Sequence, residues 1–182
     1  KLLNNEKHPV QIIWAGKPYP MDYSSISTFN TLVEESNRYK NMAVLTGYEL
    51  SLSKSLKQGS DVWLNNPRVP REASGTSGMS AAMNGTINLS TDDGWIPEFA
   101  KHGENAFVVP KADYRNLDVY QQDQYDMNAL YELLENEILP LYYDNKDEWR
   151  KIQQTAMDDV QHQFNSDRMA DEYYELLYKN AL

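Results

Sequence analysis

The chain has 182 residues, of which 41% are hydrophobic, and its formal net charge at pH 7 is −10. This composition fits a folded globular domain, and the negative charge argues against nucleic acid as a partner because phosphates would be repelled. No apolar run approaches the ~20 residues that span a membrane. The absence of cysteine excludes disulfides and thiolate metal sites and fits a cytoplasmic location.

The first residues, KLLNNEKHP, indicate the tail of a helix rather than a signal peptide. Beyond them, short apolar runs alternate with helical patterns. Strands are expected at 10–15, 41–45, 61–64, 86–89 and 106–109, and helices at 26–39, 50–56 and about 76–83. This alternation predicts a parallel sheet with helices on its faces. Ligands of such sheets bind at the carboxyl ends of the strands, so the loops after 64 and 89 are expected at the functional rim.

The composition changes after Pro110. Residues 112–126 are polar and rich in tyrosine, and we expect them to be irregular. Helices are expected at 127–143, 147–163 and 167–182, with Asn165 or Ser166 as the N-cap of the last one. We therefore expect one domain over 1–182 with a helical tail over 127–182.

The segment Pro70–Asn88, PREASGTSGMSAAMNGTIN, combines small residues, hydroxyls and one carboxylate, Glu72. Unpaired amides at a helix start attract anions, and a carboxylate beside them accepts hydrogen bonds from sugar hydroxyls. The run from Ser74 to Gly78 can thus hold a phosphate. The residues also allow a plainer interpretation, in which Ser74 or Thr76 caps an ordinary helix and Glu72 complements its dipole.

Several other polar residues allow two interpretations each. Lys17 follows the first strand and either meets a phosphate or is solvated, and Tyr48 either touches a ligand or bonds to backbone. Asp92, Asp93 and Glu98 suggest a hydrolase pair, but adjacent acids more often form a turn. The histidines have no metal-site spacing, so no metal is expected, and His102 is the least ordinary of the three, His8, His102 and His162.

EASGTSGM (Glu72–Met79), followed by AAMNGTINLSTDDGW, resembles the C-terminal domain of the α-glucan phosphorylases, the glycogen and maltodextrin phosphorylase family. The resemblance extends to VQIIWAGKPYP, to GENAFVV and to the closing helices, so it covers nearly the whole chain. It implies an α/β fold with a Rossmann-like parallel sheet, the C-terminal half of a two-domain GT-B glycosyltransferase. The N-terminal half of the same enzyme would then be a partner outside this chain.

The resemblance also implies site residues, although it assigns no catalytic one. The residues that would hold the glucosyl unit are Glu72, Ala73, Ser74 and Gly75. The residues that would border the cofactor pyridoxal phosphate are Tyr48, against its ring, and Gly75, Thr76 and Ser77, around its phosphate.

One position departs from the family. The Schiff-base lysine of the family directly follows the methionine of this motif, and here that position is Ser80. Serine cannot form an imine, so pyridoxal phosphate would be bound non-covalently at best. Two alternatives stay open: a glycosyltransferase that uses a nucleotide sugar without pyridoxal phosphate, and a non-catalytic glucan-binding relative.

The reaction that the resemblance implies is transfer of a terminal α-1,4-linked glucosyl unit to orthophosphate, which gives glucose 1-phosphate. The expected partners are an α-glucan and phosphate, with neither nucleic acid nor membrane, and a homodimer stays open. The chain alone is expected to be inactive, because the active-site cleft needs both halves of the enzyme.

Overall fold

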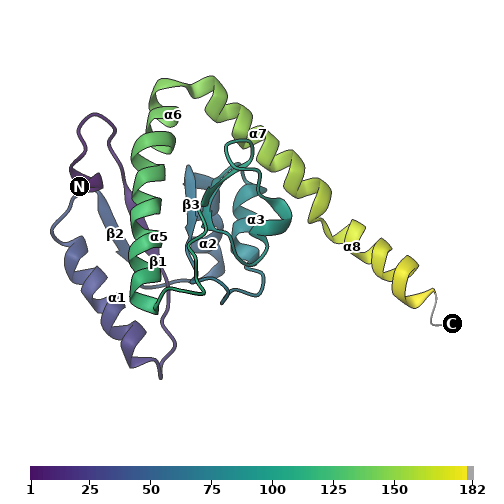
Figure 1. The fold of residues 1–182 in the computed structure, drawn as a ribbon, viewed down its shortest axis with the longest axis horizontal. Helices are drawn as coiled ribbons and strands as arrows, with labels where there is room; N and C mark the ends of the chain where they lie inside the picture. Colours follow the sequence, from purple (N-terminus) through teal and green to yellow (C-terminus); the bar gives the residue numbers. More distant parts are fainter. Residues whose placement is uncertain (180–182) are drawn as a thin grey trace. The chain divides into compact units, whose positions relative to one another are not determined.

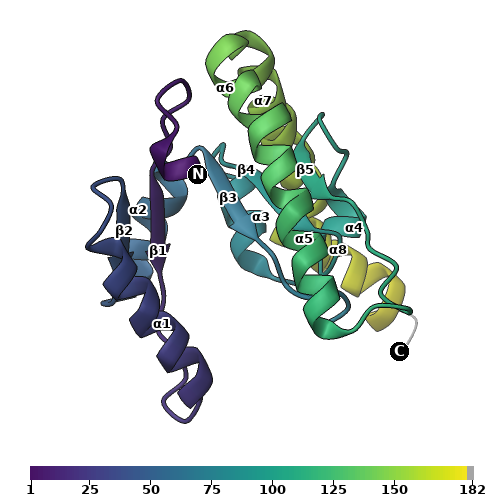
Figure 2. The same ribbon diagram turned by 60° about the vertical axis from the view of Figure 1, so that its left-hand side comes forward.

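In the computed structural model, residues 1–179 are described, and the chain divides into two compact units, Lys1–Leu56 and Lys57–Leu182. The first unit contains the strands β1 (Ile12–Ala15) and β2 (Met42–Leu45), which pair in parallel with Ile12 opposite Met42. The helix α1 (Tyr23–Ser36) connects them and runs beside them (Figure 2). Helix α2 (Leu50–Gly59) follows and is three residues longer than expected.

The prediction that the first residues form the tail of a helix is wrong, because only a short 3₁₀ turn, η1 (Leu2–Asn4), forms there. The Asn5 side chain accepts a hydrogen bond from the His8 amide at 2.9 Å and turns the chain. Asn41 then donates to the carbonyls of Leu3 and Val10, both at 2.8 Å, which fixes this segment against the start of β1. A side-chain bond of this kind competes with helical hydrogen bonds.

The second unit is built on three parallel strands in the order β3–β4–β5. They are β3 (Val62–Asn65), β4 (Ile87–Thr91) and β5 (Ala106–Val109). Helix α3 (Thr76–Ala82) lies between β3 and β4, and α4 (Ile96–Phe99), which the sequence did not suggest, lies between β4 and β5. Every strand lies within two residues of its expected bounds, and all pairs are parallel as predicted.

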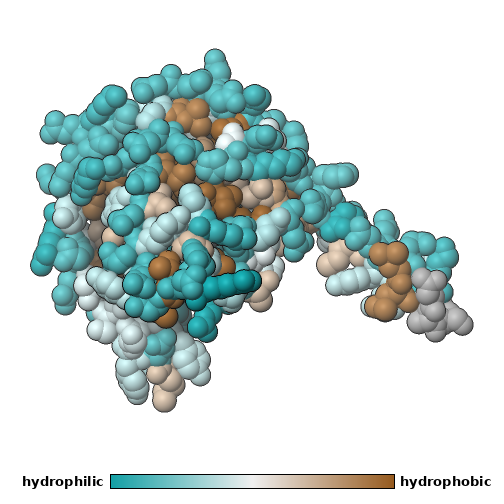
Figure 3. Space-filling model, viewed as in Figure 1, coloured by the Kyte–Doolittle hydropathy of each residue, from teal (hydrophilic) through white to brown (hydrophobic). Residues whose placement is uncertain are grey.

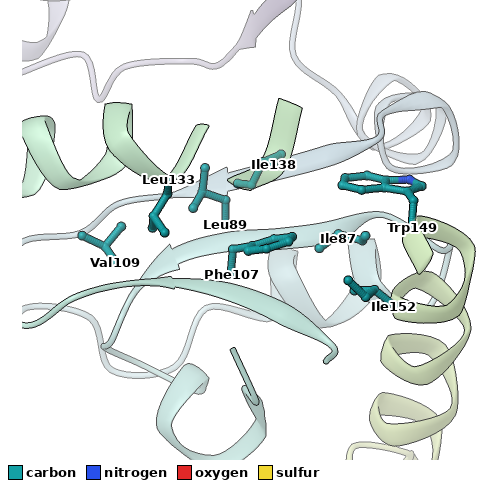
Figure 4. Packing of buried hydrophobic residues seen from close by; sticks show 8 residues of the cluster. All are labelled: Ile87, Leu89, Phe107, Val109, Leu133, Ile138, Trp149 and Ile152. Atoms are coloured by element: carbon teal, nitrogen blue, oxygen red, sulfur yellow. The ribbon is translucent and has the colours of Figure 1, made fainter. Parts of the chain in front are cut away.

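Successive residues of β4 and β5 point to opposite faces of the sheet, and each face is covered by helices. One face packs against α5 (Val119–Leu133), the segment after it and the start of α7 (Lys146–Gln163). Figure 4 shows the cluster on this face, which consists of Ile87, Leu89, Phe107, Val109, Leu133, Ile138, Trp149 and Ile152. The other face packs against α3, α4 and the rest of α7, through Ala82, Trp95, Ile96, Phe99, Ala106, Ala156 and Val160. The second unit therefore has three layers.

The expectation that residues 112–126 are irregular is wrong from Val119 onward, where α5 (Val119–Leu133) begins. Asp118 accepts a hydrogen bond from the Gln121 amide at 2.8 Å, and Gln121 Oε1 accepts one from the Asp118 amide at 3.0 Å. This reciprocal pair is a capping box, which starts a helix even in a polar sequence. A π-helical segment, η2 (Leu134–Ile138), joins α5 to α6 (Leu139–Asp144), and the three form one long helix (Figure 1).

Helix α7 (Lys146–Gln163) has the expected bounds to within one residue. Asn165 caps α8 (Ser166–Glu172), as one of the two suggested caps, and accepts a hydrogen bond from the Arg168 amide at 2.7 Å. The π-helical segment η3 (Tyr173–Tyr178) follows, and the end of the last expected helix, 180–182, lies outside the described residues. Hydrophobic residues appear on the surface of this C-terminal segment (Figure 3), among them Tyr173, Tyr174, Leu176, Leu177 and Tyr178. Within residues 1–179, none of the helices has the length and apolarity needed to cross a membrane.

Candidate functional site

Two loops of the second unit meet where the chain leaves the parallel strands. One loop, 66–75, follows β3 and carries Glu72, and the other, 92–95, follows β4. Asp93 is only 8% exposed, and its Oδ2 accepts hydrogen bonds from the amides of both Arg71 and Glu72, each at 2.9 Å. The Trp95 amide donates to the Ser74 carbonyl, also at 2.9 Å. The second loop thus fixes the backbone of the first on both sides of Ala73.

The two loops approach so closely that only glycine fits at Gly94. Its φ is +61°, which favours glycine, and a Cβ there would lie 2.8 Å from Glu72 Cγ and would overlap the Ser74 carbonyl oxygen. The sequence predicted Asp93 and Gly94 mainly as part of a turn. The structure adds that they are the support of the Glu72 loop, a role that no local pattern signals because the partners lie more than 20 residues apart in sequence.

Glu72 lies beside the start of α3, as the sugar-and-phosphate hypothesis requires. A Cβ on Gly75 would lie 3.4 Å from Glu72 Oε1, so the carboxylate is next to this glycine. Gly75 is the N-cap residue, with φ +88°, and no side chain caps the helix. The plainer interpretation, with Ser74 or Thr76 as the cap, is therefore wrong. Both of these side chains are exposed, and Ala73 is exposed as well.

Ser80 lies inside α3, one turn beyond Thr76. Its Oγ donates to the carbonyl oxygens of Thr76 and Ser77, both at 3.1 Å, and so belongs to the hydrogen bonding of its own helix. The nearest lysine in sequence, Lys101, is paired with Asp159 at 3.1 Å. Because no amine stands at position 80, the residues of α3 do not fit covalent pyridoxal phosphate.

Tyr48 and Lys17 belong to the first unit. Tyr48 follows β2 and is 42% exposed. Lys17 is also exposed and lines a shallow pocket of about 340 Å³, together with Ser24, Ser25 and Thr28 of α1. Their roles toward a cofactor or phosphate stay predictions.

The three acidic residues that suggested a hydrolase have separate partners. Asp92 forms an ion pair with Lys111 at 2.6 Å, Asp93 binds the two amides described above, and Glu98 is exposed on α4. This arrangement does not favour two carboxylates working on one glycosidic bond. Among the described residues, no group of three or more potential ligands is placed to hold a metal ion.

His102 is more firmly placed than an ordinary surface histidine. Its Nδ1 accepts a hydrogen bond from the Val108 amide at 3.1 Å, and its Nε2 lies 3.0 Å from Glu137 Oε2. Glu137 belongs to the π-helical segment η2. With Asp92 and Lys111, these residues border a shallow cavity of about 470 Å³.

The segment that leads into the Glu72 loop is fixed to α5. Arg68 makes a two-pronged ion pair with Asp123, with Nε–Oδ1 at 2.6 Å and Nη2–Oδ2 at 2.7 Å. The hydrogen bond and the charge of Arg68 lower the pKa of Asp123 below its usual value. Gln122 supports the same segment by donating to the Val69 carbonyl at 3.2 Å.

The second loop is in turn anchored in the core. Trp95 is 1% exposed and stacks on Phe99, with ring centroids 4.4 Å apart, and its ring meets the edge of Phe164 at 5.3 Å. Beneath α3, Asn88 Nδ2 donates to the Gly78 carbonyl at 3.0 Å. Trp95 therefore connects the buried aromatic cluster to the loop that carries Glu72.

Comparison with solved structures identifies the class of fold. HepE of Anabaena in complex with UDP superposes with a TM-score of 0.67 over 93% of this chain and 41% of that chain, at 14% sequence identity. The same protein in complex with UDP-glucose gives a TM-score of 0.65. The fold is the Rossmann-like α/β arrangement of parallel strands and flanking helices that the resemblance implies, followed by C-terminal helices.

Comparison of sequences identifies the relatives. The chain is 37% identical to the maltodextrin phosphorylase of Thermococcus litoralis and to the glycogen phosphorylase of Mycobacterium tuberculosis, over 100% of this chain and 22% of each enzyme. It is 46% identical to the uncharacterized protein MJ1631 of Methanocaldococcus jannaschii, over 96% of this chain and 32% of that protein. No protein-family model matches. The chain is thus a relative of the α-glucan phosphorylases along its whole length, and it spans between about a fifth and a third of the length of these proteins.

Proposed function

We propose that this chain supplies the glucosyl-binding loop of an α-glucan phosphorylase, the C-terminal half of a two-domain GT-B glycosyltransferase. The reaction would move a terminal α-1,4-linked glucosyl unit to orthophosphate and release glucose 1-phosphate. The observation that carries the proposal is the Glu72 carboxylate beside Gly75 at the uncapped start of α3. The phosphorylase names of relatives that align with the entire chain support it.

The loop combines two kinds of group that suit a sugar phosphate. The Glu72 carboxylate accepts hydrogen bonds from sugar hydroxyls, and charge-assisted bonds of this kind are among the strong ones. The amides at Gly75, Thr76 and Ser77 offer donors to a phosphoryl group. A phosphate held close to the glucosyl unit would stabilise the positive charge that develops when the glycosidic bond breaks.

The test is a phosphorolysis assay on the complete protein with maltoheptaose and orthophosphate. We expect release of glucose 1-phosphate, and we expect Glu72→Gln to lower kcat/KM by about a hundredfold, the effect of losing two charge-assisted hydrogen bonds. Glu98→Gln is the matched control, because Glu98 is an exposed carboxylate on α4, and it should leave the rate unchanged. A complete protein without phosphorolysis would contradict the proposal.

The cofactor belongs to the proposal with one restriction. The amides of Gly75, Thr76 and Ser77 suit a phosphate, but Ser80 offers no amine, so we propose that pyridoxal phosphate would be held only by non-covalent contacts. The complete protein should then show a pyridoxal absorbance band that dialysis removes even after treatment with borohydride. A band that survives both treatments would mean that a lysine elsewhere forms the imine.

A second candidate function follows from Ser80 itself. Without an imine-forming lysine, the same amides suit the diphosphate of a nucleotide-sugar donor, and the fold is shared with HepE, which has been crystallised with UDP-glucose. Glucan extension from UDP-glucose without pyridoxal absorbance would favour this function over phosphorolysis. Binding of maltoheptaose without either reaction would instead indicate a glucan-binding relative that has lost catalysis.

A further inference from the structure

We propose that Asp93 and Gly94 are positioning residues that set the geometry of Glu72 for its sugar. The inference rests on the proposed function, and it adds that the binding carboxylate depends on a second loop. Neither residue needs to touch the substrate. Both act through the backbone of 71–74.

The first observation in support of this inference is the pair of hydrogen bonds that the Asp93 carboxylate accepts. One buried carboxylate oxygen accepts the hydrogen bonds of two successive amides, those of Arg71 and Glu72, at 2.9 Å each. Successive amides that point to one side form an anion-binding concavity, and Asp93 fills it from within the protein. Since the amide of Glu72 itself is held, the direction in which its side chain leaves the backbone is held as well.

The second support is steric and independent of charge. Gly94 packs against the Ser74 carbonyl and Glu72 Cγ so tightly that a Cβ does not fit. The amide of the next residue, Trp95, donates a hydrogen bond to the same Ser74 carbonyl at 2.9 Å. Any side chain at position 94 would displace the loop, and with it both Glu72 and Gly75.

The chain offers a matched control for each residue. Asp92 is the neighbouring carboxylate, but its partner is Lys111 rather than the amides of the Glu72 loop. Gly103 has φ +75°, close to that of Gly94, but a Cβ there meets nothing within 4 Å. Comparing Asp93→Asn with Asp92→Asn, and Gly94→Ala with Gly103→Ala, separates the contact with the loop from the loss of a charge or the cost of a positive φ.

The experiment measures the dissociation constant of glucose 1-phosphate by calorimetry on the complete protein and the four variants. We expect Asp93→Asn and Gly94→Ala to weaken binding about tenfold, and both controls to stay within about twofold of the wild type. Equal affinities within either matched pair would overturn the inference for that residue. Should Asp93→Asn not fold, as judged by circular dichroism, the glycine pair decides.

A double-mutant cycle with Glu72→Gln tests whether the effect passes through Glu72. If Asp93 acts by positioning this carboxylate, Asp93→Asn should weaken binding less than twofold in the Glu72→Gln background. A general loss of structure would instead weaken both backgrounds alike, and that result would overturn the inference.

A wild-type protein that fails to bind glucose 1-phosphate would contradict the proposed function but would leave a separate readout for the inference. In that case hydrogen exchange of the Arg71 and Glu72 amides is compared between the two aspartate variants by NMR. At least tenfold faster exchange in Asp93→Asn than in Asp92→Asn would support positioning of the loop, and equal exchange would overturn it.

Discussion

Gly78 is one of the buried residues of α3, and it lies against β4 and Trp95. A Cβ at this position would come 2.6 Å from Asn88 Oδ1 and 2.9 Å from Trp95 Nε1, and both of these residues are 1% exposed. The helix can therefore approach β4 and Trp95 only because this position carries no side chain.

We expect Gly78→Ala to lower the free energy of unfolding by about 1–3 kcal/mol, the usual cost of overpacking a core. Gly59→Ala is the control, because it lies at the end of α2 with open space around it. The control should leave stability unchanged or raise it by up to about 1 kcal/mol, since alanine restricts the unfolded chain. Equal midpoints in urea denaturation of the two variants would show that α3 is less closely packed than described.

The residues of the candidate site could be predicted in part from the sequence. Glu72 and the small residues after it are contiguous in sequence. One short segment is therefore enough to predict a sugar- and phosphate-binding loop. The sequence predicts Asp93 and Gly94 mainly as part of a turn, because their partners belong to another loop. Contacts between loops depend on the order and the register of the strands. The local sequence pattern of one loop does not specify which other loop it meets.

At the scale of elements, the contact between the segment after β3 and α5 depends on the ion pair of Arg68 and Asp123. Arg68 lowers the pKa of Asp123, first through the side-chain hydrogen bond. A carboxyl whose pKa is lower in the folded state contributes stability above its unfolded pKa of about 3.9, and this contribution is lost as the pH falls through the folded value.

We therefore expect Arg68→Leu to raise the pKa of Asp123 toward its ordinary value and to reduce the pH dependence of stability in the acid range. The measurement is an NMR titration of the Asp123 carboxyl carbon. Arg150→Leu serves as the control, because Arg150 pairs with Asp147 on the exposed side of α7 at 3.2 Å. An Asp123 pKa that does not change in Arg68→Leu would mean that the ion pair does not persist in solution.

The predicted bounds of the secondary-structure elements agree best with the structure where the residues are buried. The five strands are short, and apolar residues indicate each of them. Their predicted bounds agree with the structure to within two residues. The start of α5 was missed because its first turns are polar, although Asp118 and Gln121 have the spacing of a capping box. Hydrophobic periodicity does not predict this helix start, whereas the capping-box spacing indicates it.

At the scale of the whole molecule, the relatives are three to five times longer than this chain, so under the proposed function the rest of the sugar site would lie outside it. We expect the 182-residue chain alone to show no phosphorolysis of maltodextrin. The measurement is release of glucose 1-phosphate at high enzyme concentration, with the complete protein as the positive control. Turnover by the isolated chain would refute the two-half description of the active site.

The structure at the edge of β5 affects whether copies of this chain can associate through their sheets. It is the last strand in the order β3–β4–β5, and an open strand edge normally offers its amides and carbonyls as a template for another strand. Here the Val108 amide is taken by the His102 ring, and the Ala106 carbonyl is taken by the Gly103 amide at 2.9 Å. The turn just before β5 thus occupies hydrogen-bonding groups of that edge, which disfavours the pairing of another strand with β5.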